Sequence, residues 1–217
     1  MRTSKAMVVS CAFVLLALLA GCGKVFFFSF RNEQALFNDE VAWDISGQGS
    51  YEFLPSGISL DDKALLCPYA FKGDVTIRIR LGLGFTGDEV GQLFLLVSNE
   101  PIWSPSAFHM LTFAVADPSV QGVSLIEKGD DYTLHKIITG LVPGIIKEGE
   151  NSLEMVKKGD HYKFTLNGTL LGEYDAQQYL AAWFFVQIKG QLGLATDAAS
   201  MVIEEFRAVS SGGMQEL

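Results

Sequence analysis

The sequence predicts an all-β protein folded as a sandwich of two antiparallel sheets. First, the 22 glycines and 16 phenylalanines among 217 residues, with 19% charged residues, fit many short strands joined by tight turns. Second, turn signals recur every ten residues or so, the spacing of roughly 8–12 residues that sandwiches and barrels show. Third, helical patterning is nearly absent, since Asp175–Trp183 is the one stretch with helical character. The length suits one all-β domain, or at most two small ones.

Alternation of apolar and polar side chains predicts the central strands. In the segment 75–81, valine, isoleucine and leucine occupy one face, whereas Thr76, Arg78 and Arg80 occupy the other. The run that begins at Gly91 is almost entirely apolar, which is typical of a strand covered on both faces. Further strands are predicted within segments 109–119, 123–139, 155–174, 183–197 and 201–210.

Two of these segments contain marked turns. The segment 155–174 turns at Lys158-Gly159-Asp160 and again at Asn167-Gly168, which predicts a three-stranded meander. Asn-Gly favours a type I′ hairpin turn, because both central residues need a positive φ angle. The segment 123–139 turns at Lys128-Gly129-Asp130 and therefore predicts a two-stranded hairpin.

The first 22 residues have the parts of an export signal. Arg2 and Lys5 precede an apolar run of 15 residues, which is short for a membrane-spanning helix of about 20 residues. Leu19-Ala20-Gly21-Cys22 resembles a bacterial lipobox, which implies cleavage before Cys22 and a diacylglycerol on its sulfur. The alternatives are an ordinary signal peptide and an uncleaved anchor. We therefore expect a signal peptide over residues 1–21 and a single domain over residues 22–217, anchored through Cys22.

Charge limits the partners of the chain. The net charge is −9, and removal of the signal leaves 14 Lys and Arg against 25 Asp and Glu, a net of −11. A chain this acidic is unsuited to nucleic acid and is repelled by an anionic bilayer, so membrane attachment would come through the lipid. Gly23 after the cysteine is not a retention signal for the inner membrane in well-studied Gram-negative lipoproteins, which favours the outer membrane.

The cysteines exclude a disulfide framework within one chain. Cys11 would leave with the signal and Cys22 would carry lipid, so Cys67 stays alone among apolar neighbours. We expect it to be a buried core residue.

Three segments together resemble a known group of domains. "VAWDISGQGSYEFLPSGISL" (41–60), "NSLEMVKKGDHYKFTLNGTLLGEYD" (151–175) and "GQLGLATDAASMVIEEFRAV" (190–209) resemble, in this order, stretches of laminin-G-like domains and their relatives. These belong to the concanavalin A-like lectin and glucanase group, which includes the 3-keto-disaccharide hydrolase domain. The resemblance implies a jelly-roll sandwich in which the first strand, with Phe26–Phe30, lies beside Phe206–Val209.

The paired carboxylates of the glucanases in this group are not found here. Their E-x-D-x-x-E pattern places an acid and a nucleophile on one face of a strand, near one glycosidic bond. Asp39, Glu40 and Asp44 have the wrong spacing, and plain alternation would put Glu204 and Glu205 on opposite faces. The sequence therefore favours a non-catalytic protein, although an enzyme with an unrecognised site is an alternative.

No metal or cofactor is expected. His109, His135 and His161 are far apart in the sequence, with no ligand spacing. Acidic residues at the two lysine-glycine turns could contact Ca²⁺, as in some laminin-G-like domains, but turn formation is sufficient to explain them.

Candidate binding residues come from two places. A proline-bounded loop holds Trp103 and Phe108, on which a sugar could stack, although Trp103 could instead be a lid on the core. Arg78 and Arg80 would lie on a solvated face or hold an acidic or hydroxylated ligand. Tyr132 and His135 are lesser candidates, and Trp43 and Trp183 are expected in the core.

The sequence as a whole predicts a lipid-anchored, non-catalytic binding module for a glycan or an extracellular protein. The alternatives are a glycoside-acting enzyme related to the 3-keto-disaccharide hydrolases and a structural envelope lipoprotein. Aromatic residues without carboxylates on a ligand face would favour the binding module, and clustered carboxylates would favour the enzyme.

Overall fold

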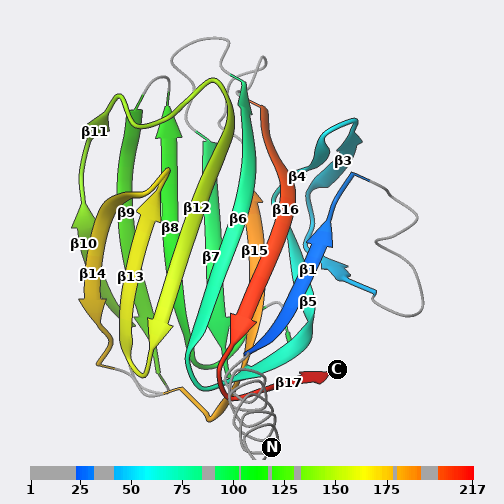
Figure 1. The fold of residues 1–217 in the computed structure, drawn as a ribbon, viewed down its shortest axis with the longest axis vertical. Coiled ribbons are helices and arrows are strands. Elements are labelled where there is room, and N and C mark those ends of the chain that lie inside the picture. The colour runs from blue at the N-terminus through cyan, green and yellow to red at the C-terminus, as the bar shows by residue number, and fades with distance from the viewer. Residues whose placement is uncertain are drawn as a thin grey trace, which may run out of the picture.

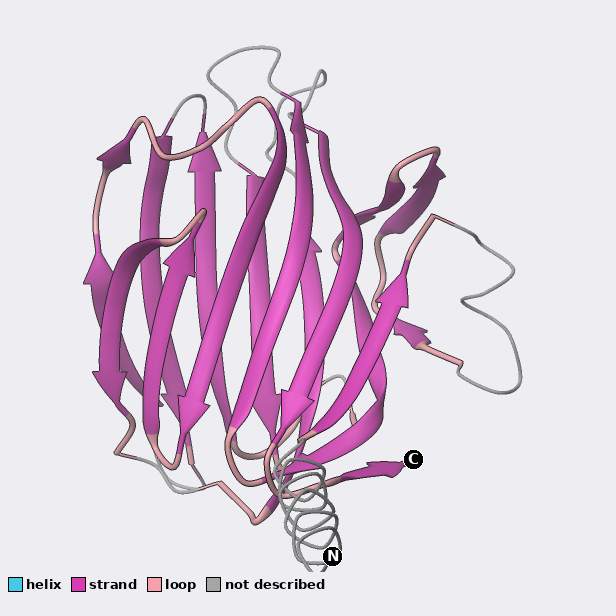
Figure 2. Ribbon diagram, viewed as in Figure 1, coloured by secondary structure: helices cyan, strands magenta, loops and turns pink. Residues whose placement is uncertain are grey.

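The computed structural model describes residues 23–31, 42–84, 91–102, 104–116, 119–129, 133–177, 180–191 and 200–217. These residues form strands joined by turns and loops (Figure 2). Among them no helix is long and apolar enough to cross a membrane.

Two antiparallel sheets pack face to face (Figure 1). Sheet A contains, in spatial order, β14 (Thr169–Asp175), β13 (His161–Leu166), β12 (Gly149–Lys158), β6 (Val75–Gly84), β16 (Ser200–Ser210), β4 (Gly57–Asp61) and β3 (Ser50–Leu54), with β1 (Lys24–Ser29) also paired to β16. Sheet B contains β10 (Thr133–Thr139), β9 (Ser119–Lys128), β8 (Phe108–Ala116), β7 (Gly91–Ser98), β15 (Trp183–Gln191), β5 (Lys63–Lys72) and β17 (Met214–Glu216), with β11 (Val142–Pro143) on β9 and β2 (Asp44–Ser46) on β5. The predicted all-β sandwich is confirmed.

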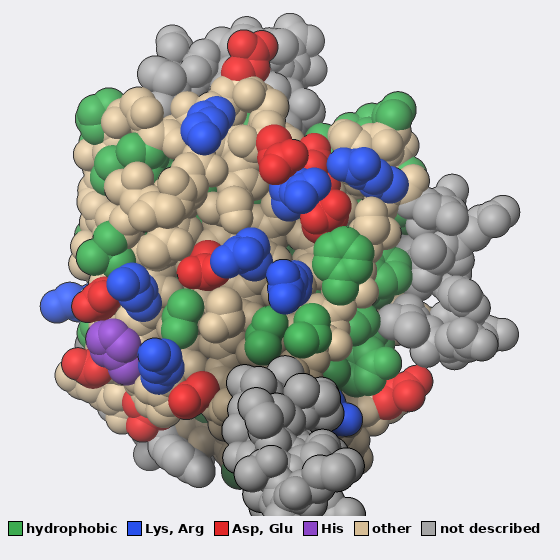
Figure 3. All heavy atoms as spheres, in the orientation of Figure 1, with side chains coloured by type: hydrophobic (Ala, Val, Ile, Leu, Met, Phe, Trp, Pro, Cys, Tyr) green, Lys and Arg blue, Asp and Glu red, His purple; other side chains and the backbone are tan. Residues whose placement is uncertain are grey.

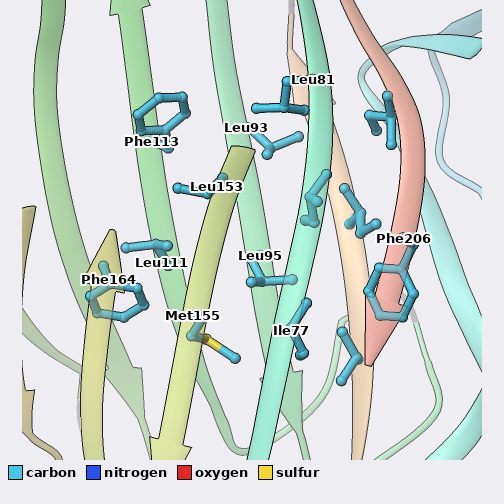
Figure 4. Close-up of a cluster of buried hydrophobic side chains, with 14 of the residues drawn as sticks. Ile77, Leu81, Leu93, Leu95, Leu111, Phe113, Leu153, Met155, Phe164 and Phe206 are labelled. Atoms are coloured by element: carbon cyan, nitrogen blue, oxygen red, sulfur yellow. The ribbon is translucent and has the colours of Figure 1, made fainter. Parts of the chain in front are cut away.

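Alternation sets which side chains enter the core. Ile77, Ile79 and Leu81 of β6 are fully buried, whereas Arg78 between them points to solvent. Figure 4 shows Leu81 beside Leu93 and Ile77 beside Leu95 of sheet B. The prediction that β7 is covered on both faces holds for its second half, where Leu96 and Ser98 on the outer side are buried, whereas Gln92 and Phe94 are half-buried.

The predicted pairing of the first strand with the strand that contains Phe206–Val209 is confirmed. β1 runs antiparallel to β16, with Phe26 opposite Ala208 and Phe28 opposite Phe206. Phe26, Phe28 and Phe30 are buried, and Trp43 packs against their rings, with centroids 5.1–6.0 Å away. Cys67 is a free, buried cysteine, as expected. Trp183, predicted in the core, is half-buried instead, with the Lys72 Nζ 5.7 Å from its ring.

The Asn-Gly turn has the predicted geometry. Asn167 has a φ of 50° and Gly168 a φ of 79°, so both central residues adopt the positive values of a type I′ turn. The Asn167 amide also fixes the neighbouring loop, since its Nδ2 donates to the Ile145 carbonyl at 2.9 Å and to the Asn151 Oδ1 at 2.8 Å.

Two further sequence expectations are corrected. A β-bulge in β16 places one extra residue between Ile203 and Glu205. Glu205 pairs with Arg80 on the outer face of sheet A, and the Glu204 carboxylate reaches the outer side of Gly82 and lies 3.9 Å from Arg31. Plain alternation fails at a bulge, so the two glutamates share one face rather than lying on opposite faces.

The expected short helix is the second correction. Among the described residues of the segment 175–183, Asp175 ends β14 and Trp183 begins β15, and none is helical. Their backbone N–H groups are bound by distant partners instead of by carbonyls one turn earlier. Gln177 N donates to the Glu127 carboxylate at 2.9 Å, and Ala181 N donates to the Asn99 Oδ1 at 2.7 Å.

One side of the sandwich is closed by a contact between the edge strands of the two sheets. β10 of sheet B lies against β14 of sheet A (Figure 1). A side chain at Gly172 would overlap the Ile138 Cγ2, because an added Cβ would lie 1.6 Å from it. Glycine at 172 therefore lets Ile138 lie directly on β14.

Candidate functional site

A groove of about 500 Å³ crosses the outer face of sheet A. Its lining combines charged side chains and one hydroxyl with two apolar side chains, as follows: Val25, Phe27, Arg78, Arg80, Glu150, Ser152, Glu205 and Arg207. Arg80 lies between two carboxylates, with its Nη1 3.1 Å from Glu205 and its Nε 3.4 Å from Glu150. Arg78 donates from Nε to Glu154 at 3.1 Å.

A row of neighbouring side chains runs across this groove. In the strand register Phe27 of β1 lies opposite Arg207 of β16, and Arg207 lies opposite Arg78 of β6. Figure 3 shows basic and apolar side chains side by side on this face. Phe27 is 55% exposed, which is unusual for an aromatic residue of a strand. The groove thus offers guanidinium donors, carboxylate acceptors and one aromatic ring.

The outer face of sheet B has a different composition. On β7, β8, β9 and β15, the outward positions whose side chains are described carry aromatic, aliphatic, hydroxyl and amide groups together with two lysines, and no carboxylate. These residues are Gln92, Phe94, Leu96, Ser98, Phe108, Met110, Thr112, Ala114, Gly122, Ser124, Ile126, Lys128, Trp183, Phe185, Gln187 and Lys189. Phe108 is half-buried, with the Lys128 Nζ 5.9 Å from its ring centroid.

The loop between β7 and β8 is tied down beside this face. Asn99 N donates to the Ala107 carbonyl at 3.2 Å, and Ser106 N donates to the Glu100 carboxylate at 3.0 Å. The Gln187 side chain donates to the Ile102 carbonyl, which fixes the loop over β15. Leu96, Ser98 and Gln187 are buried although they face away from the core.

The predicted site residues lie on two opposite faces. Arg78 and Arg80 belong to the outer face of sheet A, and Phe108 belongs to the outer face of sheet B. Cys22, Trp103 and Tyr132 lie outside the described residues, as does the side chain of His135. The ends of the loops that carry positions 103 and 132 can still be placed, because Ser98 and Lys128 both lie opposite Phe108 in the strand register.

A buried polar cluster was not predicted from the sequence. His109, Glu127, Lys157 and Tyr162 are all at most 7% exposed. The His109 Nδ1 and the Tyr162 hydroxyl are hydrogen-bonded at 2.7 Å, and the Lys157 Nζ lies 5.8 Å from the Tyr162 ring. Each of these four polar residues lies near the end of its strand, two residues from the nearest apolar side chain that faces the core, as His109 does before Leu111. That pattern was the available signal.

Burial shapes the titration of this cluster. It lowers the pKa of Lys157, against the attraction of Asp160 and Asp74. It also raises the pKa of Tyr162 well above 10.0, and the charges of Asp160 and Glu127 act in the same direction. Among the described residues, no three His, Cys, Asp or Glu side chains are placed to hold a metal ion.

Several solved structures share this architecture. The carbohydrate recognition domain of Emp46p, in a metal-free form, matches with a TM-score of 0.62 and 10% identity over 86% of this chain and 95% of that one. The carbohydrate recognition domain of Emp47p matches with a TM-score of 0.60 and 12% identity, over 84% of this chain and 93% of that one. The β-glucanase of Bacillus licheniformis matches with a TM-score of 0.57 and 9% identity, over 87% of this chain and 99% of that one. The fold is concanavalin A-like.

At these identities the likeness shows the fold alone. No family model matches the sequence, and no curated protein matches it closely. Domains described as carbohydrate recognition domains and a glucanase share this concanavalin A-like sandwich, so the choice between binding and catalysis depends on the side chains of this chain.

Proposed function

We propose that this protein is exported, anchored by lipid on Cys22, and binds a glycan without transforming it, on the outer face of sheet B. The observation that carries the proposal is the composition of that face around β7, β8, β9 and β15. Phe94, Phe108 and Phe185 are partly exposed there and suit the C–H faces of sugars. Gln92 and Ser124 on neighbouring strands, also partly exposed, suit the hydroxyls of sugars. The tied β7–β8 loop reduces the ordering cost of binding.

The fold relatives support a glycan as the ligand class, since two of them are described as carbohydrate recognition domains. The lipobox-like Leu19-Ala20-Gly21-Cys22 and the preceding apolar run support export and anchoring. An extracellular protein is the second ligand class. The cell envelope, with the outer membrane favoured, is the proposed location.

The enzyme alternative draws on sheet A. Glu150 and Glu205 lie in one groove, but both bind Arg80. A retaining or inverting glycosidase needs one carboxyl group that gives a proton and one that acts as nucleophile or base. Carboxylates held by the same guanidinium act as hydrogen-bond acceptors, so this arrangement supports a structural ion-pair network better than a catalytic pair.

A glycan-array screen followed by calorimetry tests the binding proposal. Phe108→Ala should weaken binding of the best glycan more than tenfold, a loss of about 1.4 kcal/mol or more. Phe27→Ala, a matched change on the opposite face, should leave the affinity unchanged. If both variants bind like the wild type, the site is not on β8.

Trp103→Ala is expected to weaken binding as well, if its ring joins Phe108. Turnover of any bound glycan would favour the enzyme.

The anchor has an independent test. Cys22→Ala should release the protein from the membrane fraction, because the attached acyl chains contribute about 0.8 kcal/mol per buried CH₂. Labelled fatty acid should enter the wild type and not the variant. Incorporation into the variant at wild-type level would show that the lipid, if any, is attached elsewhere.

A further inference from the structure

The start of β1 fixes where the anchor must lie. Lys24 pairs with Ser210, and Gly23 is pressed against β16, since an added Cβ would be 2.6 Å from the Ser210 carbonyl oxygen. Cys22 directly precedes Gly23 in the sequence. No linker separates the sandwich from the residue that would carry lipid. One end of sheet A is therefore held at the bilayer whenever Cys22 is acylated.

The outward side chains of β1 are apolar although they face solvent. Val25 is 52% exposed and Phe27 is 55% exposed, whereas Phe26 and Phe28 between and beyond them enter the core. At no more than about 3.6 Å per residue, Phe27 lies within about 18 Å of Cys22. Exposed aromatic and aliphatic groups this close to acyl chains are suited to the membrane interface.

The next strands add positive charge beside this apolar pair. Arg207 and Arg78 lie directly opposite each other, an unfavourable placement for like charges. Glu154 pairs with Arg78, but Arg207 has no ion pair with any described residue. A phosphate would offset this repulsion, because guanidinium groups bind phosphate oxygens through paired hydrogen bonds.

We propose that this face of sheet A lies on the membrane, with Arg207 and Arg78 binding phospholipid phosphate groups and Val25 and Phe27 entering the headgroup layer. The occupant of the groove is thus the bilayer that holds the lipid on Cys22, and the inference rests on that part of the proposed function. It gives the two outer faces separate tasks, because the glycan face of sheet B then points away from the bilayer. The chain without its signal has a net charge of −11, so the contact with phospholipid would be made where Arg207, which has no ion pair among the described residues, lies beside Arg78.

Site-directed labelling of the lipidated, full-length mature protein tests this orientation. Phe27→Cys can be labelled selectively with a fluorophore, because Cys67 is buried and Cys22 is blocked by lipid. Ile137→Cys on β10 of sheet B, at a residue 68% exposed, is the matched control. Each protein is placed in vesicles of phosphatidylethanolamine and phosphatidylglycerol that carry a nitroxide on the headgroup. The probe at 27 should be quenched several-fold more strongly than the probe at 137.

A charge reversal tests the role of the arginine. Arg207→Glu should reduce the quenching at position 27, whereas Lys136→Glu, the same charge change on β10, should not. Equal quenching at 27 and 137 in protein that floats with the vesicles overturns the orientation and leaves the anchor standing. Protein that does not float refutes the anchor and the orientation together. A soluble glycan that shields the probe at 27 without vesicles would show that the groove binds sugar instead.

Discussion

The two sides of the core contain different kinds of side chains. Beside β1 and β16, aromatic rings pack on one another, with Phe206 at 5.2 Å from Trp43 and 6.0 Å from Phe26 between ring centroids. Beside β12 and β13, four polar side chains are buried, and Tyr162 reaches across the sandwich to His109. The aromatic side gains free energy from area removed from water, with little dependence on pH. The polar side is stable only while each polar atom keeps its partner.

The largest expected effect is on the aromatic side. Phe206→Ala should lower the free energy of unfolding by about 3–5 kcal/mol, because it leaves a cavity among rings that cannot collapse fully. Urea denaturation followed by tryptophan fluorescence measures this loss. The control is Phe27→Ala, which removes the same side chain from an exposed position and should change stability by less than about 0.5 kcal/mol. Equal losses would mean that the rings around Trp43 do not form the packed cluster described above.

A smaller loss is expected on the polar side. Tyr162→Phe keeps the ring and removes the hydroxyl that is bonded to the His109 Nδ1. A buried polar atom left without its partner costs about 1–3 kcal/mol. Tyr51→Phe, at an exposed tyrosine of β3, is the control. If the two variants are equally stable, the cluster contributes no more than a surface hydroxyl.

Alkali should weaken the core through Cys67, a buried residue of β5 outside the polar cluster. Burial raises the pKa of Cys67 above its ordinary 9.0, so the folded protein keeps a proton that the unfolded chain releases. Stability from this thiol is therefore complete below pH 9 and is lost above it, by up to about 1.4 kcal/mol per pH unit. The difference in unfolding free energy between wild type and Cys67→Ala should shrink over that range. A constant difference from pH 7 to pH 10 would contradict the effect.

The polar cluster should respond less steeply to the same pH change. The raised pKa of Tyr162 lowers stability above about pH 10, in the same direction as Cys67. The lowered pKa of Lys157 acts in the opposite direction, because the unfolded chain holds more protons than the folded one just below pH 10.5. Relative to wild type, the stability lost in Tyr162→Phe should therefore shrink above about pH 10, and any stability gained in Lys157→Met should shrink as the pH rises toward 10.5. Urea denaturation of both variants at pH 8 and above pH 10 measures the two changes.

The strands could be predicted from local sequence patterns, whereas the residues that share an outer face could be known only from the complete fold. Alternation and the Asn167-Gly168 turn were sufficient for β6 and for the β12–β13–β14 meander, because period-two burial and positive φ are properties of a few neighbouring residues. The bulge before Glu205 was not visible locally, since it depends on the register with Arg80. The helix expected after Asp175 failed for a similar reason, as Asn99 and Glu127 bind its backbone from other strands.

The candidate site was predicted in part for the same reason. Arg78 and Arg80 were identified by alternation, but nothing in one strand says which partner strand lies beside it. Arg207 and Phe27 became interesting only once β1, β16 and β6 were seen as neighbours. Local patterns therefore identified single residues, and the row that they form belongs to the sheet order.

The contact between Gly172 and Ile138 has a consequence for molecules crowded on one surface. An uncovered edge strand presents unpaired N–H and C=O groups that can recruit the edge of another molecule and start aggregation. Here the edge strands β14 and β10 face each other across the closed side of the sandwich, with Ile138 seated where residue 172 has no side chain. A substitution such as Gly172→Val would push the two edges apart. The first measurable effect of this substitution should be self-association at high protein concentration, before any unfolding.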